Sequence, residues 1–141
     1  LAKHPRIAAI KEANSKISKI VETFALVGDQ LDIYSGNDDQ ITPILAMGGK
    51  GVISVLSNVV PAETVELCNR FFEGDVAGSA AMQCEYMELV KALFCEVNPI
   101  PVKSAVAAMG FCDDYIRLPL TDMEPQNKER MLGIMRAKGI I

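Results

Sequence analysis

The sequence contains no tryptophan and a single histidine, His4, and it has few aromatic residues of any kind. None of its four cysteines belongs to a C-x-x-C pair; they are Cys68, Cys84, Cys95 and Cys112. Zinc sites in proteins are built mostly from histidines and closely spaced cysteines. The shortage of these ligands argues against a zinc site, and we predict that the cysteines are buried, reduced thiols.

Positive charge and long apolar runs are also scarce. The 14 lysines and arginines are outnumbered by 18 acidic residues, giving a net charge of −4, and they are scattered along the chain. Nucleic-acid-binding surfaces are usually clusters of basic residues, so we expect no nucleic-acid partner. No stretch approaches the roughly 20 apolar residues that cross a bilayer, and no signal peptide is evident. We therefore expect a soluble, cytoplasmic protein without a membrane partner.

Half of the residues are hydrophobic, and three short runs of them have the composition of buried strands. These runs cover residues 7–10, 31–34 and 52–55, and each is followed by a helical pattern at about residues 17–25, 39–47 and 61–73. Asn14 or Ser15 is expected to cap the first helix, and Gly28 to end it. Repeated strand–helix units predict an α/β fold with parallel strands and helical crossovers.

The chain changes character after Gly74. Residues 75–141 carry only helical patterns, at about 76–95, 101–109 and 124–138; Thr121 and Glu124 resemble a capping box, and Gly139 a helix stop. Three parallel strands make a poor sheet alone, because both of its edges stay open. The sequence also begins with Leu1 and runs almost directly into the first strand. We read it as a piece of a longer protein.

In α/β folds, reactive groups gather at the carboxyl ends of the strands. Lys11 continues the apolar run of residues 7–10, and we expect it to enter an interior of low dielectric constant. Burial there would favour the neutral amine, which attacks ketones to form a Schiff base. The pattern alone favours the alternative, a strand-end lysine whose amine reaches solvent. Asp38 and Asp39, which precede a helix, are read as N-terminal caps or dipole partners rather than metal ligands.

Five segments, taken in order, carry a family resemblance. They read AAIKEAN, YSGNDDQ, GGKGVISVLSNVVP, NPIPVK and IRLPLT. Their order and spacing resemble the C-terminal half of the dihydrodipicolinate synthases, within the dihydrodipicolinate synthase and N-acetylneuraminate lyase family. The resemblance implies a (β/α)8 TIM barrel, with residues 1–74 as its last three strand–helix units. Residues 75–141 would be the helical extension that follows the barrel.

The resemblance also implies a reaction and a site. The family condenses pyruvate with aspartate semialdehyde in lysine and diaminopimelate biosynthesis, through a covalent lysine–pyruvate imine that needs no cofactor or metal. Lys11 matches the imine-forming lysine. Ile53 matches a residue whose backbone carbonyl faces that lysine, and Gly36 one that lines the pocket for the second substrate. The proton-relay groups, and those that bind the pyruvate carboxylate, belong to the missing N-terminal half, which is therefore an expected partner.

We also expect self-association, and two alternative functions remain open. By resemblance, Ile17 and Met47 belong to a face that joins copies into a homo-oligomer. One alternative is an N-acetylneuraminate or keto-deoxy-sugar-acid aldolase of the same family. Another is a noncatalytic half-barrel that binds partners through its open edges. We expect the 141 residues to be inactive alone.

Overall fold

A parallel sheet of three short strands organises the N-terminal part of the computed structural model, which describes residues 1–141. The strands are β1 (Ala9–Glu12), β2 (Asp32–Ser35) and β3 (Gly51–Val52), ordered β1-β2-β3. In the register, Lys11 lies opposite Tyr34, and Tyr34 lies opposite Gly51. The α/β class with parallel strands is therefore confirmed. Each strand begins or ends one to three residues away from its predicted position.

The predicted crossover helices are present, with corrections at their ends. They are α1 (Ile17–Val27), the 3₁₀ helix η1 (Asp38–Gln40) leading into α2 (Ile41–Ala46), and α3 (Pro61–Phe72) after the 3₁₀ helix η2 (Leu56–Asn58). Gly28 ends α1 as predicted, but its N-cap is Lys16, whose side chain makes no capping bond. The predicted cap Asn14 instead accepts the Lys16 N–H through its side chain, at 2.9 Å. Asn14 thus shapes the turn before the helix.

Only helices follow residue 75, as the sequence predicts, but there are four of them and not three. They are α4 (Val76–Glu85), α5 (Met87–Leu93), α6 (Ile100–Ala108) and α7 (Pro125–Ala137). The single helix predicted over residues 76–95 is wrong, because the chain breaks at Tyr86 between α4 and α5. The capping box is also wrong: Glu124 is the N-cap of α7 and its side chain makes no capping bond. Gly139, with φ of +68°, ends α7 as predicted, and the Ile140 N–H donates to the Met135 carbonyl at 2.9 Å.

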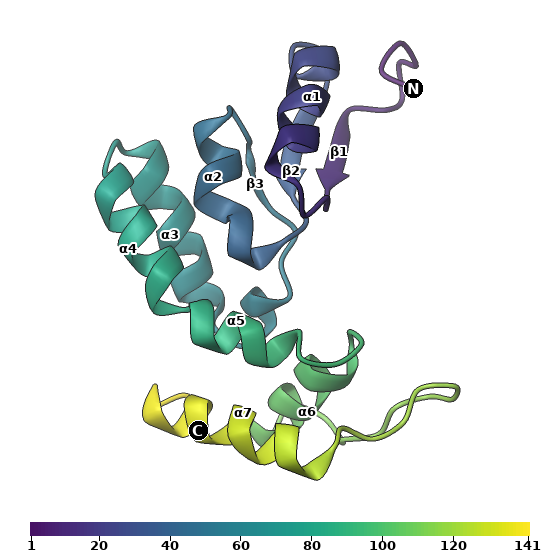
Figure 1. Ribbon diagram of the computed structural model, residues 1–141, viewed down its shortest axis with the longest axis vertical. Coiled ribbons are helices and arrows are strands. Elements are labelled where there is room, and N and C mark those ends of the chain that lie inside the picture. The colour runs from purple at the N-terminus through teal and green to yellow at the C-terminus, as the bar shows by residue number, and fades with distance from the viewer. The chain divides into compact units, whose positions relative to one another are not determined.

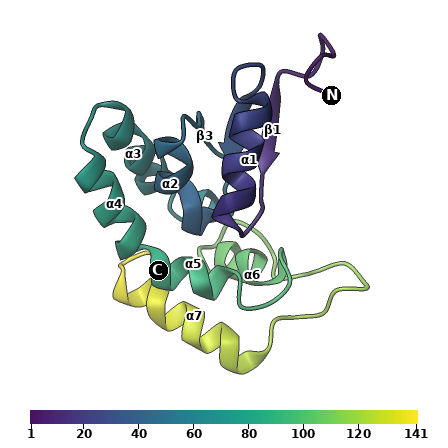
Figure 2. The same ribbon diagram turned by 45° about the horizontal axis from the view of Figure 1, so that its top comes forward.

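The chain forms two compact units that interleave along the sequence. The first, which we call the sheet unit, comprises Leu1–Ser54 and Val65–Gln83; the second, the helical unit, comprises Val55–Thr64 and Cys84–Ile141. The domain boundary predicted after residue 74 stays a prediction. In the sheet unit, Figures 1 and 2 both show α1 running alongside β1. None of the helices has the length and apolar character needed to cross a membrane.

Each unit has its own hydrophobic core. The core of the sheet unit forms where α2 meets α3, through Ile41, Leu45 and Leu67. The core of the helical unit gathers α5, α6 and α7, which pack together in Figures 1 and 2. Its fully buried side chains include Leu89, Leu93, Met131 and Met135. Burial of these apolar side chains supplies the main stabilisation of the helical unit.

Candidate functional site

Lys11 lies within β1, not after it as the sequence predicted. Side chains alternate between the two faces of a strand. Ile10 and Glu12 are partly buried, and Glu12 Oε2 accepts a hydrogen bond from Thr23 Oγ1 of α1 at 2.8 Å. Lys11 therefore points to the face opposite α1, where it is exposed. Our expectation of a buried lysine is wrong for these residues, because three strands provide no facing wall.

Gly36 lies directly against Lys11. It follows β2, and its N–H donates to the Glu12 carbonyl at 2.7 Å. A Cβ atom built on Gly36 would lie 3.0 Å from Lys11 Cε and 2.7 Å from Ala13 Cβ. Both distances are shorter than ordinary carbon–carbon contacts. Glycine at position 36 therefore avoids a clash with Ala13 and crowding of the Lys11 stem.

Ile53 is positioned by the neighbouring strand. Its N–H donates to the carbonyl of Ser35 at 2.8 Å. Ser35 is the last residue of β2 and directly precedes Gly36. Half of its side chain is exposed. The structure therefore brings Lys11 and Gly36 into contact and ties Ile53 to the same sheet edge. The role expected for the Ile53 carbonyl stays a prediction.

Tyr34 belongs to the same face as Lys11 and was missed by the sequence analysis. It lies directly opposite Lys11 in the β1–β2 register, and paired residues of neighbouring strands point to the same side of a sheet. Its ring also covers Gly51, where a Cβ atom would lie 3.5 Å from Tyr34 Cδ1. Alternation within β2 indicates the face of Tyr34, but only the register shows that it neighbours Lys11.

The loops that follow β1 and β2 are tied together by side-chain amides. Asn37 Nδ2 donates to the Asn14 carbonyl at 3.3 Å, and Gln40 Nε2 donates to the Ser15 carbonyl at 3.2 Å. Asp38 and Asp39 lie inside the first turn of η1, where they can act as dipole partners, but the N-cap is Asn37. The site is thus a face of polar loops around an exposed lysine.

The cysteines are free thiols and none of them lies among the site residues. Partial burial raises the pKa of Cys68, which packs beside the core of the sheet unit. The prediction that the cysteines are buried is wrong for Cys84 and Cys112, which are exposed. The chemistry offered by the site is therefore that of the Lys11 amine beside a tyrosine and glycine backbone.

Comparison with known families shows what this chain is similar to. The family described as the dihydrodipicolinate synthetase family matches residues 1–138. The chain belongs to this family. A 4-hydroxy-tetrahydrodipicolinate synthase from Alkaliphilus oremlandii is 47% identical over 141 residues, which is all of this chain and 49% of the relative. The chain spans about half the length of the curated relatives that it matches.

Solved structures of family members have the same fold over the matched region. The dihydrodipicolinate synthase of Thermotoga maritima is 39% identical, with a TM-score of 0.96, over 99% of this chain and 48% of that one. The Acinetobacter baumannii enzyme, solved in complex with pyruvate, is 33% identical with a TM-score of 0.93 and is covered to 48%. The arrangement of strands and helices around Lys11 is thus shared with enzymes of the dihydrodipicolinate synthase family.

Proposed function

We propose that these residues form the Schiff-base half of a 4-hydroxy-tetrahydrodipicolinate synthase, which condenses pyruvate with aspartate semialdehyde. The observation that carries the proposal is the packing of the Lys11 stem against the Gly36 backbone, in a chain whose relatives bear this name. The close approach places the Lys11 stem beside the loop that follows β2, at the carboxyl end of a parallel sheet. Those relatives favour the synthase over the sugar-acid aldolase reading.

The proposed chemistry assigns one role to Lys11. Its neutral Nζ attacks the keto carbon of pyruvate, and loss of water gives a protonated imine. The imine acidifies the adjacent methyl group, which loses a proton to give an enamine. The enamine carbon then attacks the aldehyde carbon of aspartate semialdehyde. Gly36 would line the space for that second substrate, and the Ile53 carbonyl would face the amine. No cofactor is required, since the imine itself is the electron sink.

We also propose that residues outside these 141 complete the site, as the first part of a TIM barrel. The sheet unit would then be the last three strand–helix units, and the helices from α4 onward the extension. Support comes from the outer edge of β1. The carbonyls of Ala8 and Glu12 accept hydrogen bonds from the Asp32 and Gly36 N–H groups, at 3.0 and 2.7 Å. In a parallel pair such bonding residues alternate, so the backbone groups of Ala9 and Lys11 face outward.

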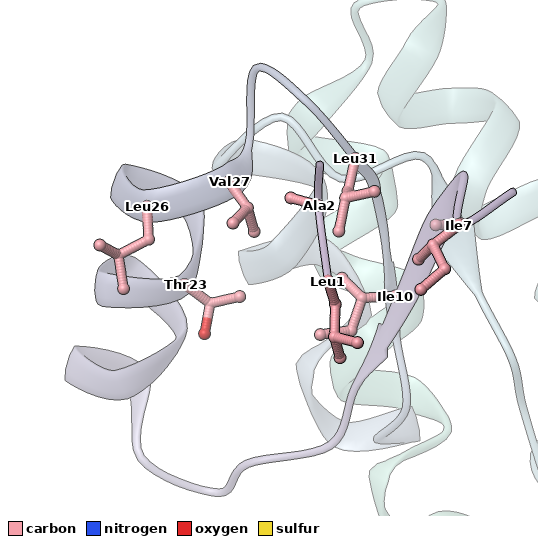
Figure 3. A pocket seen from close by; sticks show the side chains of 9 residues that line it. Leu1, Ala2, Ile7, Ile10, Thr23, Leu26, Val27 and Leu31 are labelled. Carbon is pink, nitrogen blue, oxygen red and sulfur yellow. The ribbon is translucent and has the colours of Figure 1, made fainter. Parts of the chain in front are cut away.

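An apolar groove beside this edge fits the same partner. It lies between β1 and α1, and Figure 3 shows its apolar lining, which comes from β1, from α1 and from the N-terminal Leu1 and Ala2. Open edges and exposed apolar grooves are surfaces that proteins normally cover. A strand pairing with β1, followed by a helix packing in the groove, would cover both. The homo-oligomer expected from exposed Ile17 and Met47 is a further part of this proposal.

Trapping with borohydride tests the function. In an assembly that contains the remaining part of the barrel, pyruvate with borohydride should reduce the imine and label Lys11 irreversibly. Lys11→Ala should abolish the label. Peptide mapping that finds the label on Lys50 or Lys103 would contradict the assignment. Turnover with aspartate semialdehyde, measured against N-acetylneuraminate, distinguishes the synthase from the aldolase.

A further inference from the structure

The side chain of Gln83, on α4, bonds two backbone groups at the junction of η1 and α2. Its Nε2 donates to the Asp38 carbonyl at 2.7 Å, and its Oε1 accepts the Thr42 N–H at 3.2 Å. The Thr42 N–H lies in the first turn of α2, where backbone donors have no partner within the helix. One amide thus satisfies a carbonyl and an N–H on either side of the junction.

A second polar contact lies beside the first. Thr42 Oγ1 and Ser79 Oγ are 3.0 Å apart, and Ser79 is one helical turn before Gln83 on α4. All these side chains are buried: Gln83 is 9% exposed, Thr42 8% and Ser79 0%. Burying polar groups is unfavourable unless they are hydrogen-bonded, and an apolar face would pack α4 at least as well. The burial of Gln83 is better explained by what it holds, the backbone of Asp38 and Thr42, whereas Ser79 contacts only a side chain.

The held segment continues to the lysine. Asp38 is two residues beyond Gly36, whose backbone contacts the Lys11 stem. On its other side the segment is tied to the loop after Lys11, through the side chains of Asn37 and Gln40. The loop carrying Gly36 is therefore anchored by several bonds, one of them from the Gly36 N–H to the Glu12 carbonyl. Gln83 provides an anchor from α4, which does not involve the Lys11 loop. A shift of the loop would move Gly36 relative to Lys11 Cε.

We infer that Gln83 is a positioning residue for Lys11, acting through the backbone of residues 36–42. This inference rests on the proposed role of Lys11 in imine formation. The amide is suited to the task because it donates and accepts at once. A glutamate carboxylate keeps the acceptor for Thr42 but loses the donor for Asp38. A methionine of similar length loses both.

The test compares Gln83→Met and Gln83→Glu with Ser79→Ala, which keeps both Gln83 bonds. Each variant is assembled with the remaining part of the barrel. The maximum rate of pyruvate labelling at Lys11 should fall about tenfold in both Gln83 variants, since small misplacements of reacting groups slow reactions strongly. The pyruvate concentration that gives half-maximal labelling should stay unchanged, because we expect residues outside this chain to bind the pyruvate carboxylate. In Ser79→Ala the maximum labelling rate should stay within about twofold of the wild-type rate, because both Gln83 bonds remain and the reacting groups are not displaced.

Amide hydrogen exchange gives a readout independent of labelling. Exchange at Thr42 should be faster in Gln83→Met and near wild type in Gln83→Glu, where the acceptor remains. A Gln83→Glu variant that labels at the wild-type maximum rate would overturn the inference, even if Gln83→Met fails to fold. If wild-type Lys11 is not labelled, the proposed function fails, and unchanged Thr42 exchange in Gln83→Met would overturn the loop-holding role separately.

Discussion

The Cε atom of Lys11 lies 3.0 Å from the position that a Cβ atom would occupy on Gly36. The same Cβ would approach Ala13 Cβ to 2.7 Å. A methyl group at position 36 must therefore displace either the lysine stem or the loop after β1. Among the expected site residues, Lys11 and Gly36 thus approach each other closely.

Gly36→Ala should slow labelling of Lys11 by pyruvate and borohydride by about 10- to 100-fold, because the amine is moved from its place. The measurement is the labelling rate in an assembly with the remaining part of the barrel. Gly133→Ala on α7 is the matched control, since a Cβ there meets no atom within 4 Å. It should leave labelling unchanged and stabilise the helix by about 0.5–1 kcal/mol. Equal labelling by both variants would contradict the crowding argument.

Asp114 should contribute pH-dependent stability to the helical unit. Partial burial tends to raise the pKa of its carboxyl, but hydrogen bonds from Lys128 and Ser104 and the charge of Lys128 outweigh burial, so the pKa is lowered. A carboxyl whose pKa is lower in the folded state stabilises the fold at pH values above its unfolded-state pKa. This contribution is lost as the pH falls through the folded-state pKa.

Asp114→Asn should therefore lower the unfolding free energy at neutral pH by less than about 1 kcal/mol, because the ion pair is partly exposed. The difference from wild type should disappear in acid, as pH falls below about 4 and through the lowered folded-state pKa. Urea unfolding at several pH values measures it. A difference that stays constant down to pH 2 would show that the charge plays no part.

Two leucines of the helical unit should differ sharply on truncation. Leu89 on α5 is fully buried in the core, whereas Leu118 is 81% exposed. Leu89→Ala should lower the unfolding free energy by about 2–5 kcal/mol, through lost burial and the cavity left behind. Leu118→Ala should change it by less than about 0.5 kcal/mol. Similar losses in both variants would contradict the assignment of this core.

The sequence predicted the order of strands and helices because apolar periodicity and glycine or proline boundaries are local signals. It placed the third strand at residues 52–55, whereas β3 covers Gly51–Val52. Strand ends depend on which residues find a partner on the neighbouring strand, and β2 pairs only as far as Ser35 with Val52. That information is not contained in the run itself.

The site was predicted unevenly for related reasons. Lys11 and Gly36 were recognisable from motifs, but the exposure of Lys11 depends on whether other strands face it. Gln83 was not recognised, since a glutamine on a helix usually belongs to its solvent face. Its burial follows from the packing of α4 over the start of α2, which no local pattern records.

The 141 residues alone should not catalyse the condensation. Barrel closure takes eight strands, and the sheet has three. Lys11 is exposed. We expect the groups that bind the pyruvate carboxylate and move protons to lie outside these residues. Loss of one such element commonly costs about 10²–10⁴-fold in rate, and several are missing together. A synthase assay on the chain, with its mass verified, should give no turnover, and activity should appear when the remaining part of the barrel is added.

A substitution in the groove beside β1 tests whether the remaining part of the barrel binds there. Leu26 of α1 lines the groove and is 73% exposed, so Leu26→Asp should leave the sheet unit folded. A charge there would be buried on assembly, which is strongly unfavourable without a partner, and complementation should be lost. Val65→Asp, at a 58% exposed position of α3 outside the groove, should still be complemented. Turnover by the chain alone at the rate of the complemented assembly would show that Lys11 needs no further barrel residues.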